Sequence, residues 1–108
     1  MSDNLGYMFG KVSKAVGVLI TDPCDVRNRV WTAAKYLFAV HPEGLPASCQ
    51  EDAKWIHRML TRYPAEPPYF SSARATYRRT RNVTASKIAA RVWRLYHQMD
   101  TELHARGQ

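Results

Sequence analysis

The chain has 108 residues and a formal net charge of +7, a size typical of one domain with one hydrophobic core. A hydrophobic fraction of 45% excludes an intrinsically disordered chain. Residues 1–4 lack the basic run of a secretory signal, and the apolar stretch over residues 5–20 is too short and too charged to span a membrane. We therefore expect one cytoplasmic domain over residues 1–108, without membrane contact and with Cys24 and Cys49 as free thiols.

Apolar side chains recur at helical spacing over residues 3–20, which predicts a first helix. Its small residues gather on a separate arc, made of Gly6, Gly10, Ser13 and Gly17. Small residues let a second helix approach closely, so this arc predicts a homodimer through the first helix. The alternative is that the glycines only weaken the helix, because each lowers helix stability relative to alanine.

A second helix is predicted from Asp22, as its capping residue, and Pro23, in its first turn, to about Val40. Residues 41–46 contain two prolines and a glycine and are expected to form a loop. The apolar stripe of this helix is wide, which indicates a central place in a bundle.

The segment Ser48–Glu51 matches a capping box and predicts the start of a third helix, which Pro64 ends. Asp52 falls near the middle of the apolar arc of this helix. It is either a partly exposed acid in the first turn, stabilised by the helix dipole, or a buried acid paired with an arginine. Both interpretations stay open at the level of sequence.

A fourth helix is predicted from Ser71 or Ser72 to Arg81, and a fifth over residues 85–104. Asn82 is expected to stop the fourth helix, and Thr84 to cap the fifth. No segment has the alternating pattern of a strand. The sequence therefore predicts an all-α fold, a small single-domain bundle of four to five helices. Its core is predicted to include Trp31, Leu37, Trp55, Leu60, Val92, Leu95 and Tyr96.

Positive charge is concentrated in residues 67–99, which hold seven basic side chains and no acidic one. Six of them form two helical sets of three, each set on one face of its helix, and lie off the apolar stripes, so their replacement is expected to leave folding nearly unchanged. Aromatic residues that can stack on bases are interleaved with them: Tyr69, Phe70, Tyr77 and Trp93. The predicted nucleic-acid or anion-binding residues are Arg74, Arg78, Arg81, Lys87, Arg91 and Arg94.

This pattern predicts a small basic accessory or regulatory protein that binds DNA or RNA, of the bacterial, phage, mobile-element or ribonucleoprotein-subunit type. The alternative function is that of a protein–protein adaptor or inhibitor, whose basic face docks on an acidic partner. A helix-turn-helix formed by the fourth and fifth helices is a further interpretation of the same segment. A charged face that only confers solubility is the remaining one.

Motifs for catalysis and for metal or cofactor binding do not occur: there is no HExxH, CxxC, Walker loop or GxSxG. We therefore expect no enzyme, no catalytic residue, no metal and no cofactor. The segment from Arg91 to His97 resembles the Arg-x4–6-His motif of the HEPN family over seven residues. The resemblance implies a small ribonuclease in which the histidine transfers protons and the arginine holds phosphate.

Overall fold

The computed structural model describes residues 5–65 and 71–107. Within these ranges the chain forms five α-helices, one 3-10 turn and no strand: α1 (Leu5–Thr21), α2 (Val26–Leu37), η1 (Pro42–Gly44), α3 (Ala47–Leu60), α4 (Ser72–Arg79) and α5 (Asn82–Gly107). The predicted all-α bundle is confirmed. No helix within the described residues is both long enough and apolar enough to cross a membrane.

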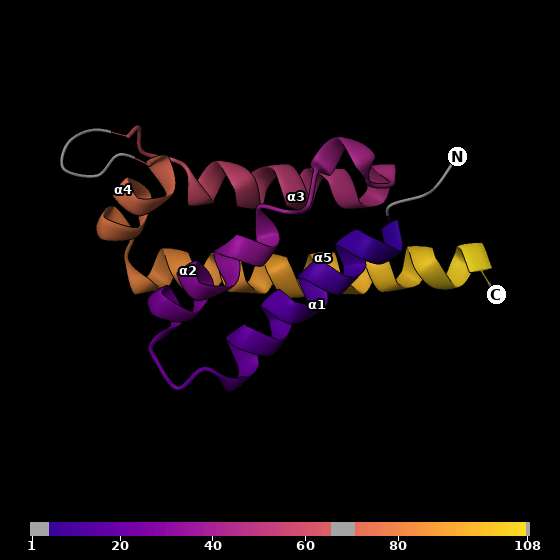
Figure 1. Cartoon of the computed structure of the whole chain (residues 1–108), viewed down its shortest axis with the longest axis horizontal. Coiled ribbons are helices and arrows are strands. Elements are labelled where there is room, and N and C mark those ends of the chain that lie inside the picture. Colours follow the sequence, from indigo (N-terminus) through magenta and orange to yellow (C-terminus); the bar gives the residue numbers. More distant parts are fainter. Residues whose placement is uncertain (1–4, 66–70, 108) are drawn as a thin grey trace.

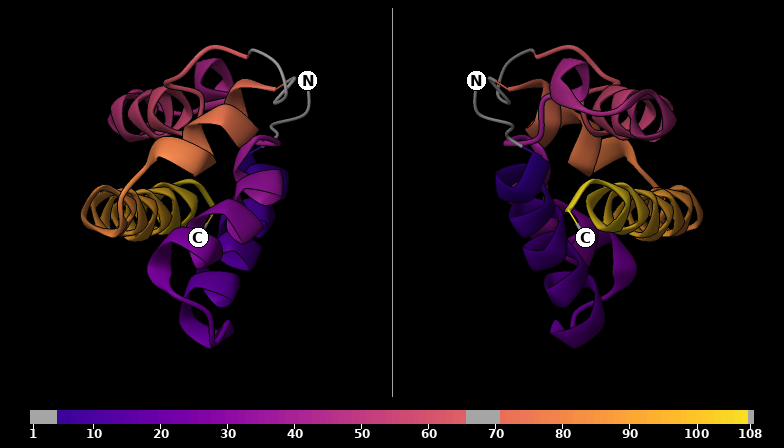
Figure 2. Two further views of the ribbon diagram at one scale, coloured as in Figure 1. Left: turned by 90° about the vertical axis from the view of Figure 1, so that its left-hand side faces the viewer. Right: turned by 90° about the vertical axis from the view of Figure 1, so that its right-hand side faces the viewer.

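The long helix α5 is the element on which the others are assembled (Figure 1). The helices α1, α2 and α3 all pack against it, and α1 and α2 also pack against each other. Seen along the long axis of the molecule, α3 and α5 lie on one side and the α1–α2 pair on the other (Figure 2). The short helix α4 has its principal helix contact with α3.

The core lies between these two layers, and the sequence located its aliphatic members correctly. The side chains of Leu37, Leu60, Val92 and Leu95 are all buried. The three aromatic residues predicted with them, Trp31, Trp55 and Tyr96, are only partly buried and pack at the edge of the core. Trp31 stays at the edge of the core because its indole nitrogen donates a hydrogen bond to the Ala73 carbonyl oxygen of α4.

The predicted starts of α2 and α3 are wrong, because Asp22 and Ser48, the predicted capping residues, form other hydrogen bonds. Asp25, not Asp22, caps α2 by accepting a hydrogen bond from the Asn28 backbone N–H, while Asp22 accepts from the Cys24 N–H in the preceding turn. The helix α2 also ends at Leu37, three residues before the predicted Val40.

The predicted capping box of α3 does not form. Pro46 occupies the N-cap position without a side-chain hydrogen bond. Ser48 lies inside the helix and its hydroxyl donates to Glu102 of α5 instead. The helix ends at Leu60, before Pro64, where the Thr61 hydroxyl donates to the His57 carbonyl oxygen.

The junction between α4 and α5 also differs from the prediction. The helix α4 ends at Arg79, and Asn82 begins α5 rather than stopping α4, so Thr84 is inside α5 and does not cap it. The Asn82 carboxamide oxygen accepts a hydrogen bond from the Arg27 N–H at the start of α2. Because α4 packs principally on α3, the structure provides no mutually packed α4–α5 pair of the helix-turn-helix kind.

The small-residue arc of α1 faces away from the rest of the protomer. A Cβ atom placed on Gly6, Gly10 or Gly17 would meet no atom of another described segment within 4 Å. These three glycines therefore make no close approach to a second helix among the described residues, and the homodimer predicted through the arc stays a prediction.

Gly10→Ala should stabilise the single chain by about 1 kcal/mol, because alanine costs less backbone entropy than glycine in a helix and has room here. Urea unfolding at several protein concentrations measures this. A loss of stability that is largest at high protein concentration and shrinks on dilution would show instead that a second chain packs on the arc.

Candidate nucleic-acid interface

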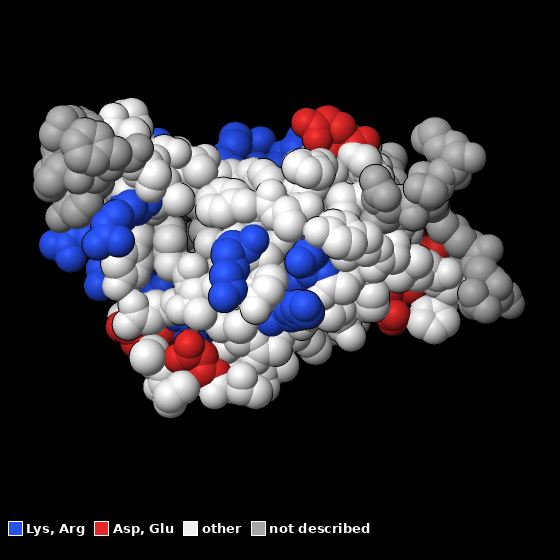
Figure 3. Space-filling view, in the orientation of Figure 1, with Lys and Arg blue, Asp and Glu red and all other residues white. Residues whose placement is uncertain are grey.

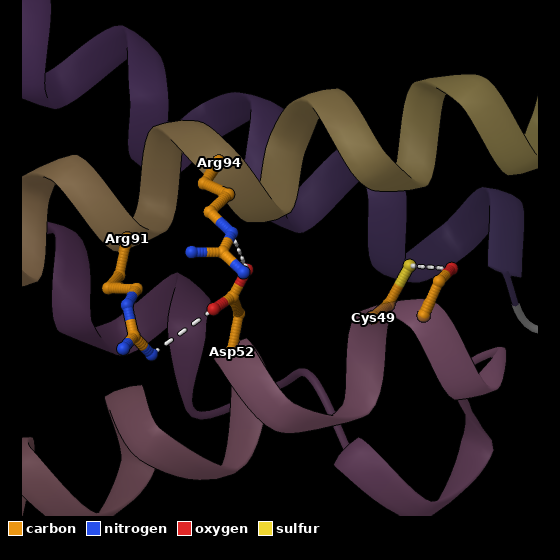
Figure 4. Close-up of polar contacts among 5 residues, drawn as sticks. Cys49, Asp52, Arg91 and Arg94 are labelled. Atoms are coloured by element: carbon orange, nitrogen blue, oxygen red, sulfur yellow. Dashed lines mark hydrogen bonds and ion pairs between the residues drawn. The ribbon is translucent and has the colours of Figure 1, made fainter.

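A buried carboxylate joins α3 to α5. Asp52 of α3 has only 2% of its side chain exposed, and two arginines of α5 converge on it (Figure 4). Arg91 Nη1 donates to Asp52 Oδ1 at 3.2 Å, and Arg94 Nε lies 3.2 Å from Oδ2. Of the two interpretations of Asp52 from sequence, the buried acid paired with arginine is confirmed.

The amide of Gln98 completes the surroundings of this carboxylate. With its nitrogen toward α3, it donates to Asp52 Oδ2 and to the Ser48 carbonyl oxygen, both at 3.0 Å. The Ser48–Glu102 hydrogen bond of 2.9 Å lies further along the same two helices. Successive contacts thus join later residues of α5 to earlier residues of α3. The two helices are therefore antiparallel, and their side chains meet along one line.

Arg91 is held by an aromatic ring as well as by the carboxylate. Its guanidinium carbon lies 4.5 Å from the centre of the Trp55 ring, close enough for a cation–π interaction. Trp55, Arg91 and Arg94 line an open cavity of about 330 Å³ together with Lys87 and Ala90. Lys87 and Arg94 are exposed there, so this stretch presents cations to solvent.

A second basic cavity lies where α3 ends, between this end, the end of α4 and the start of α5. Arg62 and Arg79 both lie over the Tyr63 ring, at 5.7 and 4.8 Å from its centre. With Arg81, Thr84 and other side chains they line a cavity of about 150 Å³. Within the described part of the chain, none of these three arginines forms an ion pair with a carboxylate.

The two cavities are neighbours because their lining residues continue on the same helix faces. Thr84 and Lys87 are three residues apart on α5, and Trp55 and Met59 are four apart on α3. We call this line of side chains the basic seam. It consists of Arg62, Arg79, Arg81, Lys87, Arg91 and Arg94. Among residues 5–65 and 71–107, the carboxylate that forms ion pairs with it is that of the buried Asp52.

Four of the six residues predicted from sequence are in the basic seam. Arg74 lies elsewhere, in a cavity of about 510 Å³ between α2 and α4 that Trp31, Phe38 and Tyr77 also line. Arg78 lines neither part of the seam. The prediction that Arg74, Arg78 and Arg81 share one helix face is wrong, because α4 ends at Arg79 and Arg81 falls in the connection to α5.

Two residues of the seam were missed. Arg62 lies two residues beyond the end of α3 but keeps the helical spacing of Trp55 and Met59, and that spacing was the available signal for it. Arg79 was passed over because it falls outside the set at positions 74, 78 and 81. The predicted stacking residues Tyr69 and Phe70 lie outside the described residues, whereas Tyr77 lines the α2–α4 cavity.

The expectation that replacing the basic residues would leave folding unchanged does not hold at Arg91. A glutamate there would place a second carboxylate beside the buried Asp52, where like charges repel strongly. Arg91 and Arg94 therefore have a structural role in addition to any role in binding.

Arg91 and His97, which carry the resemblance to the HEPN motif, are not brought together. Six helical residues separate them by about 120° around the axis of α5. Arg91 faces Asp52 of α3, whereas His97 is exposed and its ring packs edge-on against Trp93 at 4.3 Å. No group of three or more His, Cys, Asp or Glu side chains within residues 5–65 and 71–107 is placed to hold a metal ion.

The face formed by α1 and α2 has a different charge distribution (Figure 3). Lysine and arginine side chains stand there in separate groups with uncharged surface between them, and acidic side chains lie toward the edges. Comparison with known protein families, curated proteins and solved structures finds no match to this chain.

The buried carboxylate predicts an unequal response to removal of its partners. Arg91→Ala with Arg94→Ala should destabilise the protein by about 3–5 kcal/mol, because it leaves a charge buried without a cation. Asp52→Asn should cost less, about 1.5 kcal/mol, because both arginines reach water. Urea unfolding measures both values.

Adding Asp52→Asn to the double arginine variant should recover most of its lost stability, since no buried charge then remains. If the triple variant is less stable than the double variant, the arginines act by packing alone.

The two cysteines are free thiols with different surroundings. A hydrogen bond to the Asp22 carboxylate, and its negative charge, raise the pKa of the exposed Cys24 thiol. Burial raises the pKa of the Cys49 thiol, opposed in part by a hydrogen bond with Ser48.

Ellman's reagent should therefore label Cys24 alone in the native protein and Cys49 only after unfolding. Asp22→Asn should lower the pKa of Cys24, so that labelling below this pKa becomes faster as more thiolate forms. Stopped-flow absorbance measures the rate, and Cys24→Ser identifies the phase. A rate unchanged by Asp22→Asn would contradict the role of this carboxylate.

Proposed function

We propose that the protein binds nucleic acid by its sugar–phosphate backbone along the basic seam. The observation that carries the proposal is the gathering of six basic side chains along two adjoining cavities, where Asp52, itself buried, is the one ion-paired carboxylate among the described residues. Such a line repels itself, and an anionic polymer that runs along it relieves the repulsion. Arginine suits this use because its planar donors match phosphate oxygens.

Aromatic rings support the proposal by limiting the freedom of three of these arginines. Arg62 and Arg79 share the Tyr63 ring, and Arg91 lies over Trp55. A cation that is already oriented loses less side-chain entropy when it meets a phosphate. This arrangement favours binding over a face whose only role is solubility.

The two arginines at Asp52 keep donors for a ligand. A guanidinium carries five N–H donors, and the contact with Asp52 is made by Nη1 of Arg91 and by Nε of Arg94. Both side chains remain partly exposed, at 31% and 58%. The carboxylate thus orients them while both side chains still line the cavity and stay partly open to solvent.

The proposal extends to the setting predicted from sequence, that of an accessory or regulatory protein of the cytoplasm, bacterial or phage in type. The outward-facing glycines of α1 support the homodimer that belongs to it. An acidic protein partner is the second candidate, because the same charges would attract it, and the binding experiment separates the two.

Fluorescence anisotropy with labelled single- and double-stranded DNA and RNA tests the proposal. With about four to six phosphates neutralised, log affinity should fall with log salt at a slope of roughly −3 to −5. Arg81→Glu with Lys87→Glu should weaken binding to every sequence and reduce the magnitude of the slope by about 2. Neither residue contacts Asp52, so the fold should be unaffected.

The matched control is Lys14→Glu with Lys35→Glu, which makes the same change of charge on exposed positions of α1 and α2. It should weaken binding far less than the seam variant. Equal losses in the two variants would mean that net charge acts without a site. Absence of binding to all four nucleic acids near physiological salt would overturn the proposal and favour the acidic protein partner.

A further inference from the structure

The outer face of α5 carries two different stripes. Lys87, Arg91 and Arg94 lie along its border with α3. Trp93, Tyr96 and His97 lie along the opposite border, toward α1, where Tyr96 stacks on Phe9 at 5.1 Å. One helix width, about 10 Å with side chains, therefore separates a row of cations from a row of rings.

The exposed ring in the second stripe is Trp93, with half of its surface open to solvent. It is stacked on Tyr96 at 5.7 Å with an angle of 14° between the rings, and His97 packs edge-on against it at 4.3 Å. Tyr96 in turn rests on Phe9 of α1. An indole is thus held in a fixed orientation and left partly uncovered, next in sequence to the basic Arg94.

We infer that the nucleic acid is bound as a single strand, with its phosphates along the basic seam and a base stacked on Trp93. The inference rests on the proposed function. In a duplex the bases stack on one another and expose only their edges, so a protein ring cannot cover a base face. In a single strand the base faces are free, and a ring beside a basic groove is the usual way to bind them without sequence preference.

The proximity of the two stripes supports this ligand over a second protein. A protein-binding aromatic patch is depleted in charge at its centre, whereas Trp93 lies within one helix width of the cation row that ends at Arg94, whose side chain is 58% exposed. A nucleotide carries its charge and its flat apolar face a few bonds apart, which matches the arrangement of cations and ring on α5.

The test is an anisotropy titration with a labelled DNA strand, the same strand as a duplex, and a strand of abasic sugars with the same phosphates. Wild-type protein should bind the single strand more tightly than the duplex. Trp93→Ala should weaken single-strand binding by about 5- to 150-fold, the range found for loss of one stacked base. It should leave the salt slope unchanged, because no phosphate contact is lost, and Trp93→Phe should retain most of the affinity.

The abasic strand completes a double-mutant cycle, in which the Trp93 ring and the base are removed separately and together. It should bind wild-type protein about as weakly as the normal strand binds Trp93→Ala, and Trp93→Ala should cause no further loss with it. The matched control is Tyr7→Ala, which removes another exposed aromatic residue, 62% open to solvent, from α1. It should leave all affinities unchanged.

Three results would overturn the inference while the proposed function stands: duplex binding as tight as single-strand binding, an unaltered single-strand affinity of Trp93→Ala, or an equal effect of that variant on normal and abasic strands. Conversion of a dimer to a monomer by Trp93→Ala, with nucleic-acid affinity retained, would also overturn it. Absence of binding to every probe would overturn the proposed function itself.

Discussion

The burial of the Asp52 carboxylate is the constraint from which the arrangement of this surface follows. A charge removed from water needs compensating cations and hydrogen bonds. Here Arg91, Arg94 and Gln98 of α5 supply them to one side chain of α3. These contacts set how far α3 is shifted along α5, and a shift by one helical turn would leave the carboxylate without its partners.

The length of α5 lets one helix serve three environments. Its inner face supplies core residues such as Ile88 and Leu95, one border carries cations toward α3, and the other carries aromatic rings toward α1. A helix turns by about 100° per residue. Residues 82–99 of α5, which include no acidic side chain, therefore present the core face, the cation row and the aromatic row within a few turns. The bundle of α1, α2 and α3 covers the inner face and leaves the borders available.

Electrostatics and aromatic packing act together along the seam. Like charges in a row disfavour the folded state, and Tyr63 and Trp55 reduce this cost by placing the negative faces of their rings against guanidiniums. The two arginines nearest to Asp52 are neutralised in part, whereas those at Tyr63 have no carboxylate within the described residues. Among the described residues, the end of the seam formed by α4, the connection to α5 and the end of α3 therefore carries the cations without a paired carboxylate.

The sequence by itself determined the all-α class, the aliphatic core and the concentration of cations in the last third of the chain, because helical periodicity and composition are local properties. Four seam residues were predictable for the same reason. The starts of α2 and α3 were not, because Asp22 and Ser48 form hydrogen bonds that helix propensity does not contain. Only the tertiary structure decided that Asp52 is buried, that Arg62 joins Arg79 at Tyr63, and that Arg74 faces a different cavity. These outcomes depend on how α3, α4 and α5 are placed relative to one another, and that placement comes from contacts between residues as far apart as Ser48 and Glu102, which are 54 positions from each other.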